Sequence, residues 1–136
     1  MASRLWAMLR DARYALPARI ERILPGPDGA AAARLCARLQ RRGLSATIGF
    51  FAAGSATPDD VLAGNLAGIA ALAERGGGIC LALKAPQLAH DPVRIAAIVD
   101  AATAAAMPVV FDAHAPRETD ATLAALERLL PSRPGT

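Results

Sequence analysis

The chain has 136 residues, of which 54% are hydrophobic and 20% charged, a balance too apolar for a disordered tail or a solvating linker. The net charge of +3 comes from arginines scattered among the acidic residues, without an aromatic stacking platform, and no apolar window spans a bilayer. Neither nucleic acid nor a membrane span is therefore expected, and Cys36 and Cys80, which lack CxxC spacing, are expected to be reduced thiols in a cytoplasmic protein.

Residues 1–29 are predicted to form an N-terminal helical arm. The stretch 1–23 is rich in arginine and carries its apolar residues on one helical stripe, a pattern that a transit peptide shares. Asp11 and Glu21 favour the ordinary helix over the transit peptide. A turn cluster of proline and glycine over 25–29 separates this arm from a second domain, residues 30–136.

After a first helix, the second domain repeats one pattern three times: an apolar β-type run, a loop, and a helix with a capping signal. Strands are predicted over 45–51, 79–84 and 109–112, and helices over 30–42 and from near residues 57, 91 and 119 or 120. Thr57-Pro58-Asp59-Asp60 and Asp91-Pro92 combine a cap, a first-turn proline and, in the first case, carboxylates at the positive helix end.

The helical periodicity also predicts which side chains face the core. The expected buried residues are Val61, Leu62, Leu66, Ile69, Ala70 and Leu72 in the helix from residue 57, Ile95, Ile98, Val99 and Ala102 in the next, and Leu123, Leu126, Leu129 and Leu130 in the last.

These units predict an α/β fold with a parallel sheet. Continuous apolar strands are typical of strands buried on both faces, and parallel neighbours need a helical crossover. Alanine makes up about a quarter of the chain and aromatic residues 4%, which argues against an all-β fold. Three units are fewer than half of a (β/α)8 TIM barrel, so a partial barrel is expected, with a small open three-layer sheet as the alternative.

Two charged residues at predicted strand ends are the candidate site, because ligands bind at the carboxyl ends of parallel strands. Lys84 is the only lysine in the chain and suits a substrate carboxylate as a point charge; the alternative is a lysine that merely reaches solvent. Asp112 follows an apolar run and needs a cation or a hydrogen-bond donor, for which Lys84 on the neighbouring strand is a candidate; the alternative is a carboxylate that caps its own loop. His114 is a further pocket candidate, although a loop histidine is the simpler interpretation.

Three segments of the run from about Leu44 to Leu130 carry a resemblance to a known family. Residues 47–51 (TIGFF), 79–84 (ICLALK) and 110–113 (VFDA) look like successive barrel strands of the flavin-dependent proline dehydrogenase family, the second ending in the family's lysine and the third in its aspartate. Where that family has acidic residues at and after the first strand, this chain has Gly49 and Ala52-Ala53-Gly54-Ser55.

The resemblance implies oxidation of L-proline to pyrroline-5-carboxylate with hydride transfer to FAD. It makes Lys84 the catalytic and substrate-binding residue that holds the proline carboxylate, and Asp112 a second catalytic residue that orders the pocket. The later strands that supply most flavin contacts in that family have no counterpart before Thr136, so we expect a truncated and by itself inactive portion. The alternative is a non-catalytic α/β module that self-associates or docks on a partner through open sheet edges.

Overall fold

The computed structural model describes residues 29–52, 55–75, 77–113 and 115–129. Its elements in chain order are α3 (Gly29–Gln40), β1 (Ala46–Ile48), α4 (Pro58–Leu72), the 3-10 turn η1 (Ala73–Arg75), β2 (Ile79–Leu83), the 3-10 turn η2 (Ala85–Leu88), α5 (Pro92–Ala104), β3 (Val109–Phe111), the 3-10 turn η3 (Pro116–Glu118) and α6 (Thr119–Leu129). The predicted N-terminal arm lies outside the described residues apart from Gly29, which begins α3. None of the helices in the described ranges is long and apolar enough to cross a lipid bilayer.

The three strands form one parallel sheet in the order β1-β2-β3. The register aligns Ala46 with Ile79 and Leu81 with Val109, so each strand starts at the same edge of the sheet. This confirms the predicted α/β class with a parallel sheet. The strands are shorter than the sequence predicts, most clearly β1, where three residues pair and the following loop runs on without a partner strand.

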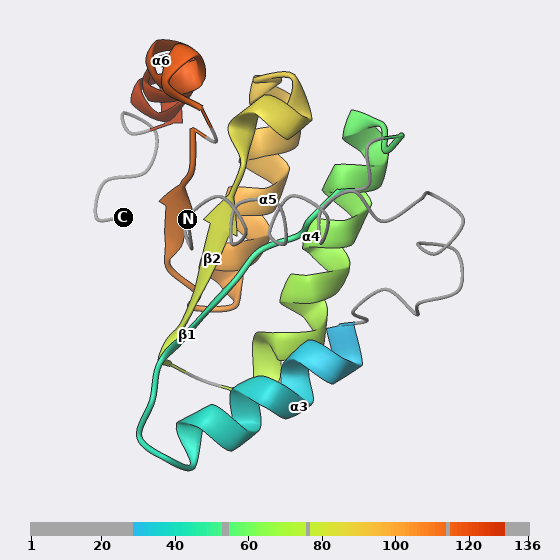
Figure 1. Cartoon of the computed structure of the whole chain (residues 1–136), viewed down its shortest axis with the longest axis vertical. Helices are drawn as coiled ribbons and strands as arrows, with labels where there is room; N and C mark the ends of the chain where they lie inside the picture. The colour runs from blue at the N-terminus through green and yellow to red at the C-terminus, as the bar shows by residue number, and fades with distance from the viewer. Residues whose placement is uncertain (1–28, 53–54, 76, 114, 130–136) are drawn as a thin grey trace, which may run out of the picture.

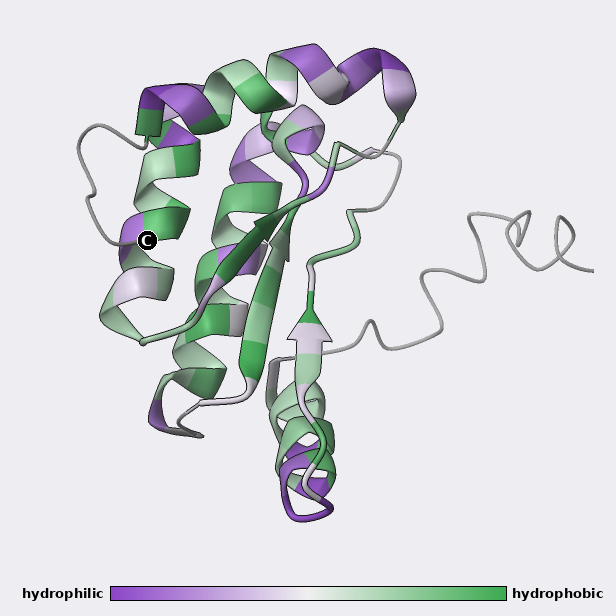
Figure 2. Ribbon diagram, turned by 90° about the vertical axis from the view of Figure 1, so that its left-hand side faces the viewer, coloured by the Kyte–Doolittle hydropathy of each residue, from purple (hydrophilic) through white to green (hydrophobic). Residues whose placement is uncertain are grey.

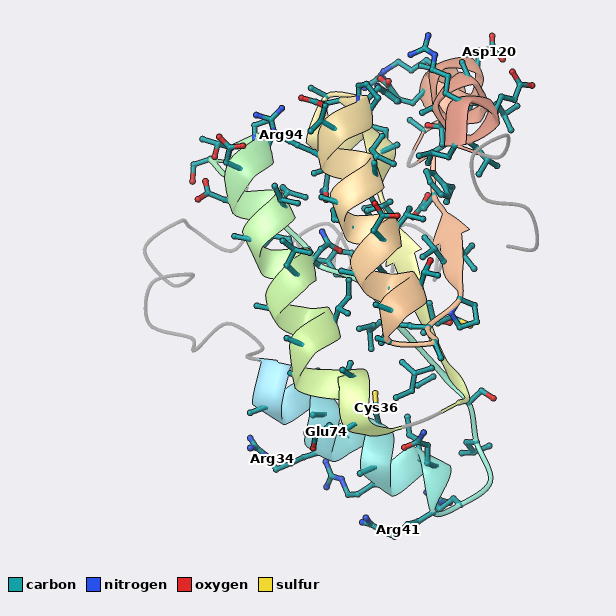
Figure 3. All side chains as sticks on the ribbon, turned by 180° about the vertical axis from the view of Figure 1, so that it is seen from behind. Arg34, Cys36, Arg41, Glu74, Arg94 and Asp120 are labelled. Carbon is teal, nitrogen blue, oxygen red and sulfur yellow. The ribbon has the colours of Figure 1, made fainter. Side chains whose placement is uncertain are left out.

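Helices α4 and α5 cover one face of this sheet. They lie behind the strands in Figure 1 and in front of them in Figure 3, which shows the molecule from the opposite side. Helix α3 packs against α4 and β1 at the amino ends of the strands, and α6 lies at the carboxyl ends (Figure 1). The core between sheet and helices contains Val61, Ile69, Leu72, Ile79, Leu81, Leu83, Ile95, Ile98 and Ala102, all less than 4% exposed.

Polar residues gather at the two ends of this arrangement. In Figure 2 the purple residues concentrate on α3 and α6, whereas the strands are mostly green. The carboxyl edge of the sheet, below α6, is therefore the place where apolar strands meet polar groups, as expected for the binding edge of a parallel sheet.

The two predicted capping signals are confirmed. The Thr57 side chain accepts a hydrogen bond from the Asp60 amide, and the Asp60 carboxylate accepts one from the Thr57 amide at 2.8 Å, which completes a capping box at the start of α4. The Asp91 carboxylate accepts from the Val93 and Arg94 amides at the start of α5. Helix α6 differs: Thr119 is itself helical, because the chain already turns at η3, so the predicted cap at Thr119 or Asp120 is wrong.

The buried faces of the helices follow the prediction fully in α5 and in part elsewhere, where Val61, Ile69, Leu72 and Leu129 are buried as predicted. In α5 the buried residues are the four that the periodicity predicts. In α4, Asn65 is buried and Ala70 is exposed, whereas Leu62 and Leu66 are partly buried. In α6 the buried positions are Thr122, Ala125 and Leu129, and Leu123 is 51% exposed.

Candidate functional site

The two strand-end residues singled out by sequence lie side by side at the carboxyl edge of the sheet. Leu83 pairs with Phe111 in the last register position, and the Asp112 amide donates to the Leu83 carbonyl at 2.9 Å. That bond extends the ladder by one step and brings Lys84 level with Asp112. The backbone of Lys84 is fixed from its other side, because its carbonyl accepts from the Gln87 amide at 3.1 Å within η2.

Opposite charges meet at this edge. The Lys84 Nζ lies 3.5 Å from the Asp112 Oδ2, and the two side chains differ in exposure, 8% for Lys84 and 46% for Asp112. A buried ammonium needs an anionic or hydrogen-bonding partner, since burial without one is costly. Asp112 supplies that partner while half of its own side chain remains accessible.

An aromatic ring forms the second neighbour of the ammonium. The Lys84 Nζ lies 4.3 Å from the centroid of the Phe51 ring, within the range of a cation–π contact. Phe51 is 78% exposed, although it belongs to the loop that follows β1 directly. Lys84 is thus held between a carboxylate and a ring that faces outward.

The neighbouring residue Phe50 determines where Phe51 lies. Phe50 turns to the helix side, where a Cβ at Gly64 of α4 would come within 2.4 Å of its ring. Because glycine leaves that space, the Phe50 ring packs directly on the α4 backbone. The next residue, Phe51, does not join this packing, and its ring lies over the Lys84 ammonium instead.

Gly49 leaves room beside the ammonium on the same face. A Cβ at Gly49 would lie 3.9 Å from the Lys84 Nζ and 3.2 Å from the Ala82 carbonyl oxygen. A larger side chain here would fill the space next to the charge, and an acidic one would compete with a ligand carboxylate. Gly49 therefore places no side chain next to the Lys84 ammonium.

The other histidine and carboxylate candidates have different roles. His114 lies outside the described residues. The His90 Nε2 lies 3.3 Å from the Thr122 Oγ1, so the segment after η2 contacts α6. Asp59 does not pair with Asp60 but forms an ion pair with Arg94, with Nη2 and Oδ1 2.8 Å apart.

Arg94 joins the starts of α4 and α5. Its guanidinium binds Asp59 of α4 and Asp91 of α5, and it lies at the upper ends of both helices in Figure 3. Hydrogen bonds from the Val93 and Arg94 amides hold the pKa of Asp91 below its ordinary value of 3.8. The Thr57 hydroxyl and amide lower the pKa of Asp60 in the same way.

These carboxylates bear on whether the described residues suit FAD. A flavin dinucleotide needs cations or free helix N-terminal amides for its pyrophosphate. At the carboxyl edge, the Thr57 hydroxyl accepts from the Asp60 amide of α4, the Asp91 carboxylate accepts from the Val93 and Arg94 amides of α5, and the cations Lys84 and Arg94 are both paired with aspartates. The described residues therefore do not fit the dinucleotide part of FAD. Nor do they contain a group of three or more His, Cys, Asp or Glu side chains that could hold a metal ion.

A second polar surface lies far from this edge. Arg34, Arg38 and Arg41 follow one side of α3 and line shallow hollows, and Arg41 points away from the rest of the molecule in Figure 3. Cys36, on the other side of α3, is buried, and both Cys36 and Cys80 are free thiols.

Sequence reasoning missed Phe51 as a site residue, because it assigned the whole of 45–51 to an apolar strand. A usable signal was present. Thr47, Gly49 and Phe51 alternate along one face, as Cys80, Ala82 and Lys84 do in β2, so the register of two parallel strands would have set Phe51 beside Lys84.

Comparison of the chain with protein-family models, with curated proteins and with solved structures gives no match.

Proposed function

We propose that this chain forms part of a (β/α)8 barrel of the proline dehydrogenase type and binds an amino or imino acid at Lys84 and Asp112. The observation that carries the proposal is the ion pair itself: a buried ammonium 3.5 Å from a half-exposed carboxylate at the carboxyl edge of a parallel sheet. Ligands of parallel α/β folds bind at this edge.

The arrangement of layers supports a barrel rather than an open three-layer sheet. In a (β/α)8 barrel the helices cover the outer face of the sheet, the inner face packs within the barrel, and the site lies at the carboxyl ends of the strands. Among the described elements, α4 and α5 lie on one face, while Lys84, Asp112 and Phe51 meet on the other. The strand order β1-β2-β3 follows the chain, as it does in a barrel.

The paired charges favour a zwitterionic ligand. A ligand with only a carboxylate would be attracted by Lys84 but repelled by Asp112. A ligand with only an ammonium group would be attracted by Asp112 but repelled by Lys84. An α-amino acid presents both charges a few bonds apart, so its carboxylate can bind the Lys84 ammonium while its amine binds the Asp112 carboxylate. Proline, the substrate of the family that the motifs resemble, is such a ligand.

In that family FAD accepts the hydride from bound proline. In this chain the described residues orient the substrate: Lys84 holds the carboxylate, and Asp112 holds the amine. They do not supply a fitting site for the dinucleotide, so we propose substrate binding without turnover by these residues alone. A desalted mixture of the chain with FAD should accordingly retain no flavin absorbance, whereas retained flavin that bleaches with proline would contradict this.

The binding proposal has a direct test, because Lys84 is the only lysine of the chain. Protein labelled with [13Cε]lysine gives a single lysine side-chain signal in NMR spectra, without any assignment. L-proline and glycine should shift it at lower concentrations than propionate or pyrrolidine, which carry one charge each. Equal responses to proline and propionate, or no response to either zwitterion, would contradict the proposal.

Variants of the pair provide a second measurement. Lys84→Met and Asp112→Asn should each weaken binding of radiolabelled L-proline roughly tenfold or more in equilibrium dialysis, as expected for loss of a hydrogen bond to a charged group. Arg128→Met, which removes one positive charge from exposed α6, is the matched control and should leave binding unchanged. If Arg128→Met weakened proline binding as much, the effect would be due to the net charge of the protein and not to the Lys84–Asp112 pair.

One observation favours a second candidate, a module that self-associates through its sheet. β1 and β3 pair with β2 on one side only among the described strands, and Val110 of β3 is 53% exposed. Unpaired strand edges are templates for a second copy. Sedimentation velocity over a wide range of protein concentration should then show a dimer, and a monomer at every concentration would exclude this candidate.

A further inference from the structure

The position of Phe51 goes beyond charge recognition. The ring lies next to the charged atom that would bind a ligand carboxylate, yet it is the most exposed of the large hydrophobic residues that the structure describes as exposed. An exposed phenylalanine leaves apolar surface in contact with water, and covering that surface is favourable. Its free face is available to the part of a ligand that extends away from the two charges.

The ring is also held in place. Phe50 is packed against the α4 backbone at Gly64, which anchors the loop one residue before Phe51, and Gly49 places no side chain beside the Lys84 Nζ. The Lys84 ammonium provides a second attachment for the ring at 4.3 Å. A ring whose position is fixed before the ligand binds loses little conformational entropy on binding.

We infer that Phe51 is the specificity-determining residue of this edge: its ring selects amino or imino acids whose apolar side group lies against it, over glycine and over polar amino acids. This inference rests on the proposed function, because it assumes that Lys84 and Asp112 hold the zwitterionic end. Each methylene group of the ligand that the ring covers should strengthen binding about fourfold.

The experiment compares L-proline with glycine, which shares the charged end but has no side group. Dissociation constants are measured from the single Lys84 signal in the wild type and in Phe51→Ala, Phe51→Leu and Leu123→Ala. Leu123 is the matched control, an exposed apolar residue of α6 away from the ion pair. Phe51→Leu keeps an apolar side chain without the flat ring, and provides a second variant should Phe51→Ala perturb the loop.

We expect Phe51→Ala to weaken L-proline binding by about fourfold for each covered methylene and glycine binding by no more than about twofold. Phe51→Leu should fall between the two, and Leu123→Ala should match the wild type. In the free protein, the Lys84 side-chain protons should lose a ring-current shift in Phe51→Ala. Absence of that shift in the wild type would overturn the inference, because the ring would not lie on the ammonium.

Two further outcomes separate the inference from the proposed function. If glycine and proline both bind, and Phe51→Ala weakens both equally or neither, the ring does not select the side group and the inference is wrong while the binding proposal stands. If no zwitterion moves the Lys84 signal in the wild type, the proposed function fails and the inference fails with it.

Discussion

The two faces of β2 differ in their surroundings: one packs against helices, and the other does not. Ile79, Leu81 and Leu83 face α4 and α5 and are at most 2% exposed. Cys80 and Ala82, between them, face the other side and are half-buried, and the alternation leads on to Lys84 at the strand end. The strand is apolar throughout, so the sequence of β2 alone does not distinguish the face that stabilises the fold from the face that carries the charged pair.

The difference between the faces separates two roles within one short strand, stability on the covered face and binding on the uncovered face. The covered face buries large side chains against helices, and substitutions there should change the free energy of unfolding. The uncovered face carries small residues followed by Lys84, and substitutions there should change binding while leaving stability nearly constant. Four measurements would break or sharpen this division.

The largest effect is expected at the centre of the covered face. Leu81→Ala should lower the free energy of unfolding by about 2 to 5 kcal/mol, the range for a buried leucine that leaves a cavity. Urea denaturation followed by circular dichroism measures it. Cys80→Ala on the opposite face is the matched control and should cost about 1 kcal/mol or less. Equal losses at the two positions would show that both faces are buried to the same degree.

A smaller effect is expected where the covering helix α4 begins. Thr57→Ala removes the hydroxyl that completes the capping box with Asp60 and should cost about 1 kcal/mol. Thr57→Ser keeps the oxygen and should retain most of that stability in the same urea titration. Since the cap supports the helix layer, neither variant should alter binding at Lys84, and a change in proline affinity would mean that α4 also positions the loop to Phe51.

The pH dependence of stability should reflect Asp91, which caps α5. Its pKa is lowered in the folded chain, so its stabilising contribution is complete above the ordinary value of 3.8 and is lost as the pH falls through the folded pKa. Thermal unfolding midpoints of the wild type and of Asp91→Asn should therefore differ most near neutral pH and converge in strong acid. A constant difference at all pH values would show that the charge of Asp91 does not matter.

The smallest effect is expected on the uncovered face of β3. Val110→Thr exchanges one exposed β-branched side chain for another and should change the free energy of unfolding by no more than about 0.5 kcal/mol. A loss approaching that of Leu81→Ala would reveal that something covers this face in solution. Sedimentation velocity of the same variant would then identify whether a second copy is the cover.

The sequence predicts the order of elements well because its signals are local. Apolar runs, the Thr57 box and the Asp91 cap depend on neighbouring residues, and the structure confirms them. The four buried positions of α5 are correct as well, and this helix lies behind β2 in Figure 1.

Helix α6 shows where local signals are insufficient. Periodicity alone predicts that its leucines turn inward, yet Thr122 is buried and Leu123 is half-exposed. Thr122 takes part in a tertiary contact, because its hydroxyl lies 3.3 Å from the His90 Nε2, and α6 also packs on η2 and α5. That contact joins residues 32 positions apart, which no helical periodicity records.

The candidate site, too, was predictable only as far as local sequence signals reach. Strand-end position alone selects Lys84 and Asp112, and the structure brings them to 3.5 Å. The unequal exposure of the pair and the ring of Phe51 depend on the register of β1 against β2 and on the packing of Phe50 on Gly64. Those are properties of three elements together, so the single strands could not reveal them.

The central position of β2 has a consequence for how the molecule opens. Among the described strands β2 has neighbours on both sides, while β1 and β3 do not touch each other, so either outer strand can separate and leave the other ladder intact. Backbone amides of β1 and β3 should exchange with solvent deuterium through such partial openings, and those of β2 more slowly. Because Lys84 follows β2 whereas Asp112 and Phe51 follow the outer strands, fraying at one edge would release one neighbour of the ammonium while the other remains.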